Sequence, residues 1–418
     1  MFLSRIKIAN FKSLKDVEIN SEGLVALVGP NGSGKTNFAL AMKFLSEVHQ
    51  HGLEMAISRA GGFENIAYRK GKRTTAPIEF EVEMRFDLEQ MRKYIEFAWL
   101  PQSLVRQARS IVACHYFACK ACGSGIRAEF VVEHETIRVE SRRPRKGVGF
   151  IGTITRNKEG AVEVKAKGGP KRLKNMFHGE TKIGKQELLI SRHRDLFTRT
   201  LSLFLGSFGV FHFSSGDIRK SGVPTPNPAL AMSGDNLPTM VDWLQKKQPK
   251  AWRGVLDAMQ DVAPGLEEIT VYPLASKTYG LLFKEEGVKL PWRIDEVSDG
   301  TIHALSMLVA AADPRVSALV IEEPESSLHP WIIYELTKKL CELSKDKSIF
   351  LTTQSPIVID TLRPSEVWIV SRRKGKTEIR RLTELDSRIE GDWSKGKYGL
   401  SEFLDSGLIP RAVPGGRM

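Results

Sequence analysis

The alternation of apolar and polar residues divides the chain into predicted strands and helices. Residues 2–8 (FLSRIKI) and 24–28 (LVALV) read as strands, and the unbroken apolar run of the second predicts burial on both faces. Phe38, Met42 and Leu45 are spaced by four and three, which predicts a helix shortly after the second strand. The N-terminal part is therefore expected to run strand, strand, helix.

Regular elements return after a long irregular stretch. Residues 77–86 alternate like a strand, whereas about 90 to 215 mixes a helical patch with alternating pieces and predicts a partly β insertion. Neither a fixed-period repeat nor sustained heptads appear. The final third predicts, in order, a helix at 300–312, a strand at 318–322, a helix at 330–344, a strand at 348–352 and a hairpin in EVWIVSRRKGKTEIRRL.

The sequence GPNGSGKT at 29–36 lies between the buried strand and the helix, and it matches G-x-x-x-x-G-K-[ST]. Glycines let backbone N–H groups surround phosphate oxygens, and the helix N-terminus adds the positive end of its dipole. Lys35 is expected to reach the β- and γ-phosphates, and the Thr36 hydroxyl is expected to ligate Mg²⁺. A glycine-rich turn that binds nothing is the alternative, which the flanking strand and helix disfavour.

Two adjacent carboxylates, Glu322 and Glu323, end the apolar run LVIEE. An unpaired charge in a core is costly, so two acids at the tip of a buried strand indicate a function. Mg²⁺ prefers hard oxygen ligands, which makes Glu322 the predicted metal ligand, and Glu323 is predicted to polarise the water that attacks the γ-phosphate. Strands 24–28 and 318–322 are then expected to be parallel in one sheet. An acidic loop after a core strand is the alternative.

Two further stretches carry residues suited to phosphate. In VSDGTIHAL, Ser298 and Gly300 open a helix whose N–H groups can bind an anion, although the same residues fit an ordinary N-cap. In TTQSP, Gln354 ends the strand expected beside LVIEE, because a right-handed crossover through helix 330–344 makes the two strands neighbours. Gln354 can hydrogen-bond the γ-phosphate or the water from there, and an ordinary loop glutamine is the alternative.

The ordered set GPNGSGKT, VSDGT, LVIEEPESSLHP and TTQSP resembles the ABC-type ATPase heads of the SMC, RecF and OLD group, especially its stand-alone bacterial members. IKIANFKSLKDVEI looks like their first hairpin, and the likeness covers about 1–90 and 230–410. It implies an α/β P-loop NTPase with a mixed-sheet core and an N-terminal β lobe. The implied division is 1–90 for the N-terminal half of the ATPase core, 91–229 for a basic, mixed α/β insertion and 230–418 for the C-terminal half.

The resemblance also implies a site shared by two copies of the chain. In this group two heads sandwich two ATP molecules, so Ser298 and Gly300 are expected to act on the nucleotide of the other copy, which 326–330 (SSLHP) would face. The implied residues are Glu323, Gln354 and Lys35 for catalysis, Asn31, Gly32, Ser33, Gly34, Lys35, Thr36, Asn37, Ser298 and Gly300 for ATP, and Thr36 and Glu322 for Mg²⁺.

Two positions depart from the family pattern. Glu322 stands where an aspartate is usual, and Gln354 where a histidine is usual; a glutamine cannot become a cation, so slow or partner-stimulated turnover is expected. For the usual metal-ligating loop glutamine, Asn65 is the nearest candidate. Neither a long coiled coil nor a further acidic nuclease domain is expected, because residues 90–290 are short and irregular and about 60 residues follow the glutamine.

Charge and cysteine content indicate a partner and a compartment. The net charge is +13, most of it between Arg138 and Lys185, which suggests contact with nucleic acid; a solvated positive face is the alternative. Only four cysteines, a start unlike a secretory signal and no apolar run near about 18 residues favour a reducing cytoplasm and no membrane contact.

Three of the cysteines lie close together in CHYFACKAC. Cys114, Cys119 and Cys122 have the C-x4-C-x2-C spacing of some iron–sulfur proteins, and His115 or His134 is a candidate fourth ligand for zinc. The same stretch also reads as a half-buried strand that carries small thiols.

The leading hypothesis is a dimerising ATPase that acts as a switch in DNA repair or bacteriophage defence, with a separate effector such as a nuclease or toxin. The alternative is an ATP-dependent scaffold or inhibitor that holds and releases such a partner. The nucleotide-binding subunit of a membrane transporter suits VSDGT but not the basic insertion.

Overall fold

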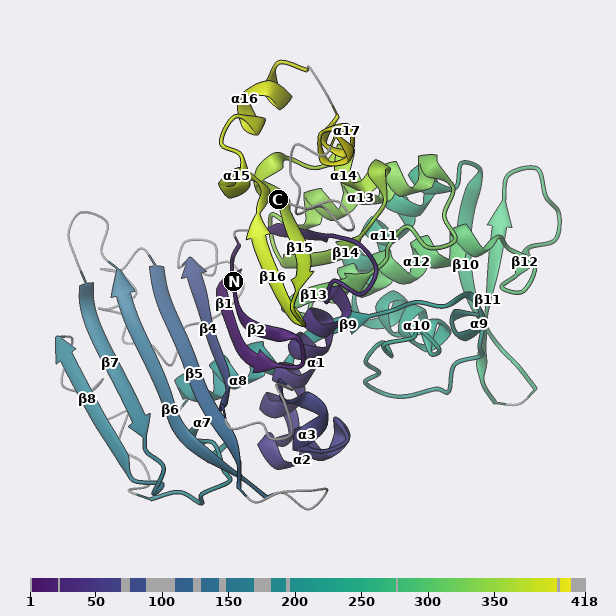
Figure 1. Ribbon diagram of the computed structural model, residues 1–418. Coiled ribbons are helices and arrows are strands. Elements are labelled where there is room, and N and C mark those ends of the chain that lie inside the picture. The colour runs from purple at the N-terminus through teal and green to yellow at the C-terminus, as the bar shows by residue number, and fades with distance from the viewer. Residues whose placement is uncertain are drawn as a thin grey trace. The chain divides into compact units, whose positions relative to one another are not determined.

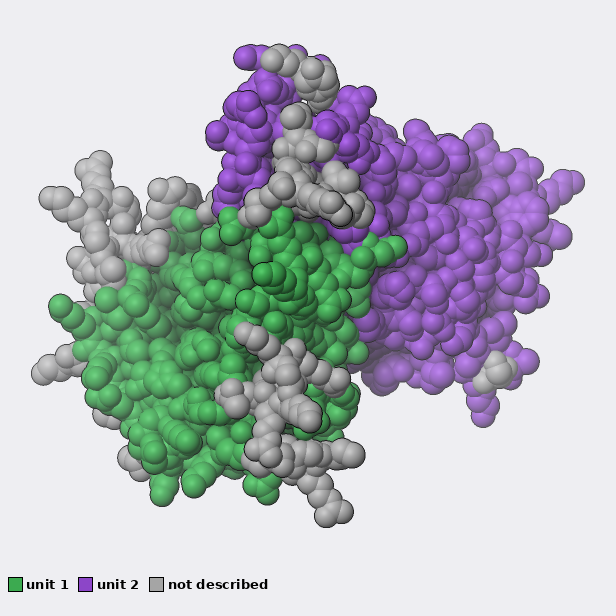
Figure 2. Space-filling view, in the orientation of Figure 1, with its two compact units in different colours: residues 1–22, 31–208, 370–380 green, residues 23–30, 209–369, 381–418 purple. Residues whose placement is uncertain are grey.

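The computed structural model describes residues 2–21, 23–68, 76–87, 110–122, 129–142, 148–168, 182–192, 196–275, 277–396 and 399–406. The chain forms two compact units, each assembled from three separate stretches (Figure 2). The helical patch expected near residue 90 and parts of the basic segment 138–185 lie outside the described residues. The three-part division expected from the sequence stays a prediction. Unit 1 contains residues 1–22, 31–208 and 370–380, and unit 2 contains residues 23–30, 209–369 and 381–418.

Unit 1 is built on a sheet in which neighbouring strands are mostly antiparallel (Figure 1). The N-terminal hairpin appears as predicted, and the insertion supplies long strands to this same sheet. In spatial order the strands are β8 (Val162–Gly168), β7 (Val148–Arg156), β6 (Glu129–Arg142), β5 (Ser110–Cys122), β4 (Ile78–Asp87), β1 (Phe2–Phe11) and β2 (Leu14–Asn20), and β16 (Lys376–Arg381) pairs in parallel with β2.

One face of this sheet is covered by helix α1 (Lys35–His51), which packs against α2 (Leu53–Arg59) and α8 (Leu196–Gly206). The short helices α3 (Phe63–Ile66) and α7 (Leu189–Arg192) complete the unit. Its core contains a cluster of aromatic rings with centroids 5.4–5.7 Å apart. Burial of each ring stabilises the fold by about 1.5–3 kcal/mol. The rings belong to Phe11, Phe44, Phe80 and Phe117.

A chain of polar side chains, of which His49 is half-buried and His115 and Glu135 are buried, joins the last turn of α1 to strands β5 and β6. His49 Nδ1 lies 2.8 Å from the Leu45 carbonyl, His49 Nε2 lies 3.1 Å from His115 Nδ1, and His115 Nε2 lies 3.0 Å from Glu135. A carbonyl only accepts, so a neutral His49 donates from Nδ1 and accepts at Nε2. Glu135 also accepts two backbone N–H groups of α7. Burial, together with the charge on His115, lowers the pKa of His49 to about 3.

Unit 2 is built on parallel strands. Strand β3 (Leu24–Val28) pairs in parallel with β14 (Ser348–Thr353) on one side and with β15 (Val367–Arg373) on the other. Strand β13 (Ala318–Glu322) follows β14, again in parallel, and β9 (Phe208–Phe211) lies beyond β13. The prediction that strands 24–28 and 318–322 share one parallel sheet is confirmed, as is the neighbouring position of the TTQSP strand.

Helices flank this sheet, and the most buried of them is α12 (Asp299–Ala312), in which every residue from Ile302 to Ala311 is buried. A side chain caps the N-terminus of α12, α13 (Pro330–Leu343) and α14 (Pro356–Thr361). The other elements are α9 (Ser215–Ile218), α10 (Leu237–Lys247), α11 (Pro249–Val262), a second sheet of β10 (Leu266–Pro273), β11 (Tyr279–Glu285) and β12 (Trp292–Arg293), the 3₁₀ turn Pro364–Glu366, α15 (Leu382–Leu385), α16 (Ile389–Ser394) and α17 (Leu400–Asp405). None of the helices in the described ranges is long and apolar enough to cross a membrane.

Candidate nucleotide site

The predicted phosphate loop is divided between the units: Gly29 and Pro30 follow β3 in unit 2, and Asn31 to Thr36 lead into α1 in unit 1. Gly32 and Gly34 have φ of +75° and +114°, a left-handed region that L side chains rarely adopt. Gly34 is also confined, since a Cβ there would lie 2.1 Å from Oγ1 of Thr377. The glycines are therefore required by the backbone path and by close packing.

A directed chain of hydrogen bonds fixes the loop from below. Thr377 Oγ1 donates to the Ser33 carbonyl at 2.7 Å, so it accepts from Ser13 Oγ, also at 2.7 Å, and Ser13 accepts from Asn37 Nδ2 at 2.7 Å. Ser13, Ser33 and Thr377 are all buried. The side chain of Asn37, predicted to contact ATP, is thus engaged in supporting the loop.

The loop presents groups that fit phosphate. The Ser33 hydroxyl is buried without a hydrogen-bond partner among the described residues, and a buried unpaired hydroxyl is costly unless a ligand completes it. Lys35 is buried with 6% exposure, whereas Asn31 and Thr36 are exposed. An anion with several acceptor oxygens satisfies the Ser33 hydroxyl and the N–H groups together, so these residues fit a nucleotide phosphate.

The predicted carboxylates lie in unit 2, where β13 ends at Glu322. Glu322 is buried and sits opposite Thr352 of β14 in the parallel register. Glu323 has φ of +48° and leaves the strand, so the alternation of strand side chains does not govern its direction. Its N–H donates to the Thr352 carbonyl at 2.8 Å, which holds this strained conformation in place.

A third carboxylate, Glu325, was not singled out in the sequence. Its Oε1 accepts from the Thr353 hydroxyl at 2.8 Å and from the Gln354 N–H at 2.9 Å. Glu325 therefore fixes the backbone at the end of β14. The side chain of Gln354 is exposed, and the position of this backbone sets its direction. Its Oε2 is buried without a partner in the described part of the chain.

Ser298 is the N-cap of α12, and its Oγ accepts from the Thr301 N–H at 3.2 Å. The residue is exposed, whereas Gly300 is buried, and a Cβ at Gly300 would lie 3.5 Å from the Ser327 carbonyl. Ser327 itself has φ of +65°. The stretches VSDGT and SSLHP, which the sequence treats separately, therefore pack together within unit 2.

Arg219 supports the start of α12, and local sequence gave no sign of this. Its guanidinium donates to the carbonyls of Ile294 and Val297 and to Asp299, and this contact lowers the pKa of the Asp299 carboxyl. Next to it, Ser215 Oγ lies 3.1 Å from Nε2 of buried His303 in α12. These contacts hold both the segment before Ser298 and the first turns of the helix.

Two weaker predictions have clear positions in the structure. The Asn65 amide, the candidate metal ligand, donates to the Gly61 carbonyl at 2.9 Å within unit 1. The CHYFACKAC stretch is strand β5, in which Cys119 is buried and Cys122 exposed. No group of three metal-ligating side chains occurs in the described ranges, so the proposed iron–sulfur or zinc site among these cysteines finds no support.

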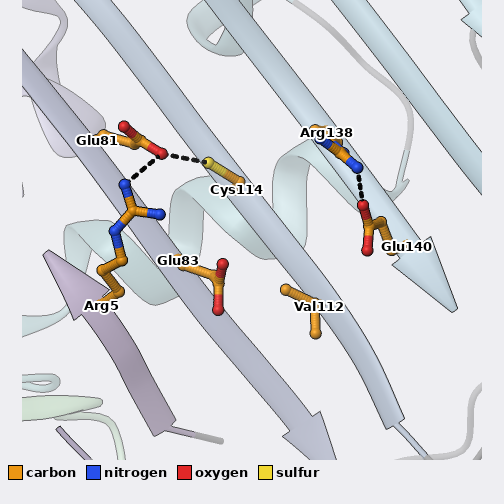
Figure 3. Close-up of a pocket in the computed structure, with 7 residues that line it drawn as sticks. All are labelled: Arg5, Glu81, Glu83, Val112, Cys114, Arg138 and Glu140. Carbon is orange, nitrogen blue, oxygen red and sulfur yellow. Dashed lines mark hydrogen bonds and ion pairs between the residues drawn. The ribbon is translucent and has the colours of Figure 1, made fainter. Parts of the chain in front are cut away.

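Cys114 lines a shallow hollow on the polar face of the unit 1 sheet (Figure 3). Its thiol lies 3.9 Å from Glu81, and burial with the nearby carboxylates raises its pKa to about 12, so the thiol is protonated. Arg138 in the same hollow pairs with Glu140.

Two family models match the chain. The model described as "AAA ATPase domain" matches residues 1–198, and the model described as "AAA domain, putative AbiEii toxin, Type IV TA system" matches residues 198–360. The DNA replication and repair protein RecF of Beutenbergia cavernae is 33% identical over 87 residues, which are 20% of this chain and 22% of that protein. The match thus spans about a fifth of this relative.

Solved SMC heads share the fold. The SmcHead bound to the C-winged helix domain of ScpA matches with a TM-score of 0.53 and 14% identity, over 91% of this chain and 97% of that one. The Smc head domain of Pyrococcus furiosus with an extended coiled coil, bound to the C-terminal domain of ScpA, matches with a TM-score of 0.50 and 13% identity, over 93% and 99%. At these identities the likeness establishes the fold alone.

Proposed function

Because this chain is an SMC- and RecF-like ABC-type P-loop ATPase, we propose that two copies bind two ATP molecules between them and hydrolyse them. The cycle acts as a switch in a DNA-related process, repair or bacteriophage defence, in the cytoplasm and with a separate effector. One observation carries the shared site: Ser298 is exposed at the N-terminus of a 14-residue helix, where its hydroxyl and the helix N–H groups can meet a phosphate of another copy.

The roles follow from the chemistry of each group. Lys35 and the N–H groups of residues 31–36 hold the phosphates. Thr36 and Glu322 would ligate Mg²⁺, which would neutralise charge on the phosphate oxygens. Glu323 accepts a proton from the attacking water, a bond forms from that water to the γ-phosphorus, and the bond to the leaving ADP oxygen breaks. Gln354 orients the water without supplying charge, which favours slow turnover.

The test is Glu323→Gln, with Glu342→Gln on α13 as the matched control, since that carboxylate is 62% exposed. Loss of the base should lower kcat by about 10²-fold or more while ATP still binds, and an ATP-dependent dimer should accumulate in light scattering. Ser298→Arg should leave ATP binding by the monomer intact but abolish both dimer and hydrolysis. Wild-type turnover in Ser298→Arg would disprove the shared site, and wild-type turnover in Glu323→Gln would disprove the role of Glu323 as the base.

A second candidate function is an ATP-dependent scaffold or inhibitor that holds and releases a toxin or nuclease. One observation favours it, because the description of the model that matches residues 198–360 names a toxin and a type IV toxin–antitoxin system. The two functions differ in their partner. If nucleic acid neither binds nor stimulates turnover, whereas a co-expressed toxin or nuclease binds the ATP-loaded Glu323→Gln dimer and leaves after hydrolysis by the wild type, the scaffold function is correct.

A further inference from the structure

The hairpin formed by β15 and β16 carries positive charge that the proposed ATP cycle does not use. Its unit 1 part contains five cationic side chains and one carboxylate, Glu378, within nine residues. This density exceeds that of the chain as a whole, where 62 basic residues are spread over 418 positions. The five residues are Arg372, Arg373, Lys374, Lys376 and Arg380.

The turn of this hairpin is tight. Lys374 and Gly375, its two central residues, have φ of +47° and +78°, as a type I′ turn requires, and this turn matches the twist of the strands beside it. Thr377 and Ile379 are buried in unit 1, so the base of the hairpin is anchored. A short, anchored turn holds its side chains near one place, and less conformational freedom is lost when they bind.

The cations are available for an external partner. Arg372, Lys374, Lys376 and Arg380 are exposed, and Arg373 is half-exposed. Among the described residues none of the five forms an ion pair. Most other surface cations of the sheet, by contrast, pair with a carboxylate. Several unneutralised charges this close together repel one another, and a polyanion relieves that repulsion.

The basic insertion is less suited to this role in its described part. Arg138 pairs with Glu140, and Lys165 pairs with Glu163 at 2.9 Å. Arg156 is fully buried, and its guanidinium donates to the carbonyls of Val132 and Gly184, so it is a structural residue. Part of the positive charge of the insertion, from which the sequence predicts contact with nucleic acid, is therefore neutralised or buried inside unit 1.

From this contrast we propose that the β15–β16 hairpin binds the phosphate backbone of nucleic acid. The inference deepens the nucleic-acid part of the proposed function, on which it rests, and moves the contact from the insertion to this hairpin. Contacts of lysine and arginine with phosphate oxygens are independent of sequence, so the hairpin positions the strand and does not read bases.

The hairpin also touches the phosphate loop of the same unit. Arg372 Nη1 donates to the Gly32 carbonyl at 3.4 Å, and Thr377, two residues after Gly375, donates to the Ser33 carbonyl. A polyanion bound by Arg373, Lys374 and Lys376 is therefore in contact with a segment that itself contacts the phosphate loop. Bound nucleic acid is expected to change ATP turnover through this connection.

The test compares two triple variants with the same change in charge. Arg373→Gln/Lys374→Gln/Lys376→Gln removes cations from the hairpin and leaves Arg372 and Thr377 unchanged. Lys247→Gln/Lys250→Gln/Arg253→Gln removes three exposed cations of α10 and α11 in unit 2. Binding of fluorescein-labelled 30-base-pair DNA, and of single-stranded RNA of 30 nucleotides, is measured by anisotropy between 50 and 200 mM salt.

The hairpin variant should bind duplex DNA about tenfold more weakly or worse, with a salt slope lower by about 0.9 for each phosphate that is no longer neutralised. Its ATP affinity and basal turnover should equal the wild type, while stimulation by DNA disappears. The control variant should behave as wild type. A deficit limited to RNA would identify RNA as the source of the backbone.

Four outcomes would overturn the inference. Equal losses of DNA affinity in both variants would mean that net charge alone matters. If the hairpin variant bound DNA and RNA as the wild type does, the contact would be assigned to the insertion. A parallel fall in ATP affinity would assign the hairpin to the nucleotide. If the wild type bound no nucleic acid at any salt concentration, the nucleic-acid role itself would fail, whereas the ATPase test with Glu323→Gln would stand.

Discussion

Arg219 Nη2 lies 2.5 Å from Oδ1 of Asp299, and these two residues, 80 positions apart in sequence, fix the start of helix α12. The same guanidinium reaches the Val297 carbonyl at 2.7 Å. Ser298 lies between the two contacted residues, so its backbone is clamped on both sides. A residue outside the recognised motifs thus supports the segment that carries the exposed hydroxyl.

Arg219→Met keeps the length of the side chain but removes these donors, and it leaves two carbonyls and a carboxylate without their partner. We expect kcat to fall about tenfold, while ATP binding is retained, because only the Ser298 segment is released. The loss of stability should be about 1–3 kcal/mol. Turnover and urea unfolding measure these two effects.

The matched control for Arg219 is Lys220→Met. Lys220 is 58% exposed and pairs with Asp217 on the surface, so its loss should change neither turnover nor stability noticeably. Arg219→Lys should restore part of the rate, since one ammonium can reach Asp299 but cannot serve all three acceptors. Equal effects of Arg219→Met and Lys220→Met would contradict the clamp.

Thr377→Val tests the support of the phosphate loop. Valine has the shape of threonine but no hydroxyl, so the Ser33 carbonyl loses its donor and Ser13 loses its acceptor in a buried place. We expect ATP affinity to fall about three- to tenfold and stability to fall by about 1–3 kcal/mol. Titration with a fluorescent nucleotide measures the first, and Thr377→Ser, which keeps the hydroxyl, should stay near wild type.

Gly34→Ala tests the confinement of the same loop. The added Cβ meets Thr377 Oγ1 at 2.1 Å and is strained by φ of +114°, so nucleotide binding should be abolished. Gly34→Ala/Thr377→Ala removes the steric clash but not the strain, and it should recover binding only in part. Gly32→Ala, which has open space around it, should cost only the strain at φ of +75°, about 1–2 kcal/mol. Full binding by Gly34→Ala would contradict the described loop.

The stability of unit 1 should depend on pH through His49. Its pKa is about 3 in the folded chain and 6.5 when unfolded, so between these values the unfolded state binds more protons. Stability is then complete above pH 6.5 and declines as the pH falls, with a slope that approaches about 1.4 kcal/mol per pH unit for one proton. The groups facing His49 are His115 and, through it, Glu135, which also lies near Arg156.

Urea unfolding between pH 6.5 and 5 measures this slope before most carboxylates titrate. His49→Gln keeps a donor and an acceptor but does not titrate, so the slope should decrease. A residual slope is expected from His303 in unit 2, whose pKa burial also lowers. If wild type and His49→Gln lose stability in parallel over this window, His49 is not the group responsible.

The sequence predicts local helices and strands better than it predicts contacts between distant residues. Strands 24–28 and 318–322 were predicted to the residue, because each is an unbroken apolar run that stops at a glycine or a carboxylate. Helix α12 was displaced by one residue at its start, since Ser298 caps it and Asp299 already belongs to it. Local periodicity and capping are sufficient for such elements.

The supports of the site could not be predicted in this way. Thr377, Arg219 and Glu325 act through hydrogen bonds to segments 28 to 364 residues away, and no periodic pattern records such a pairing. The buried Arg156 shows a different kind of error. Composition alone counts this interior, structural cation as surface charge. Residue type gives the chemistry of a site, whereas tertiary contacts decide which residues are free to perform it.

The hydrogen bond from Thr377 to the distant Ser33 has a consequence for synthesis of the chain in the cell. A ribosome adds Thr377 344 residues after Ser33, so the hydrogen bond that supports the loop stays unmade while the residues between them are synthesised. Closing it late is slow, because loop closure between distant segments is entropically unfavourable. Nascent chains that stall before residue 377 should therefore fail to retain nucleotide.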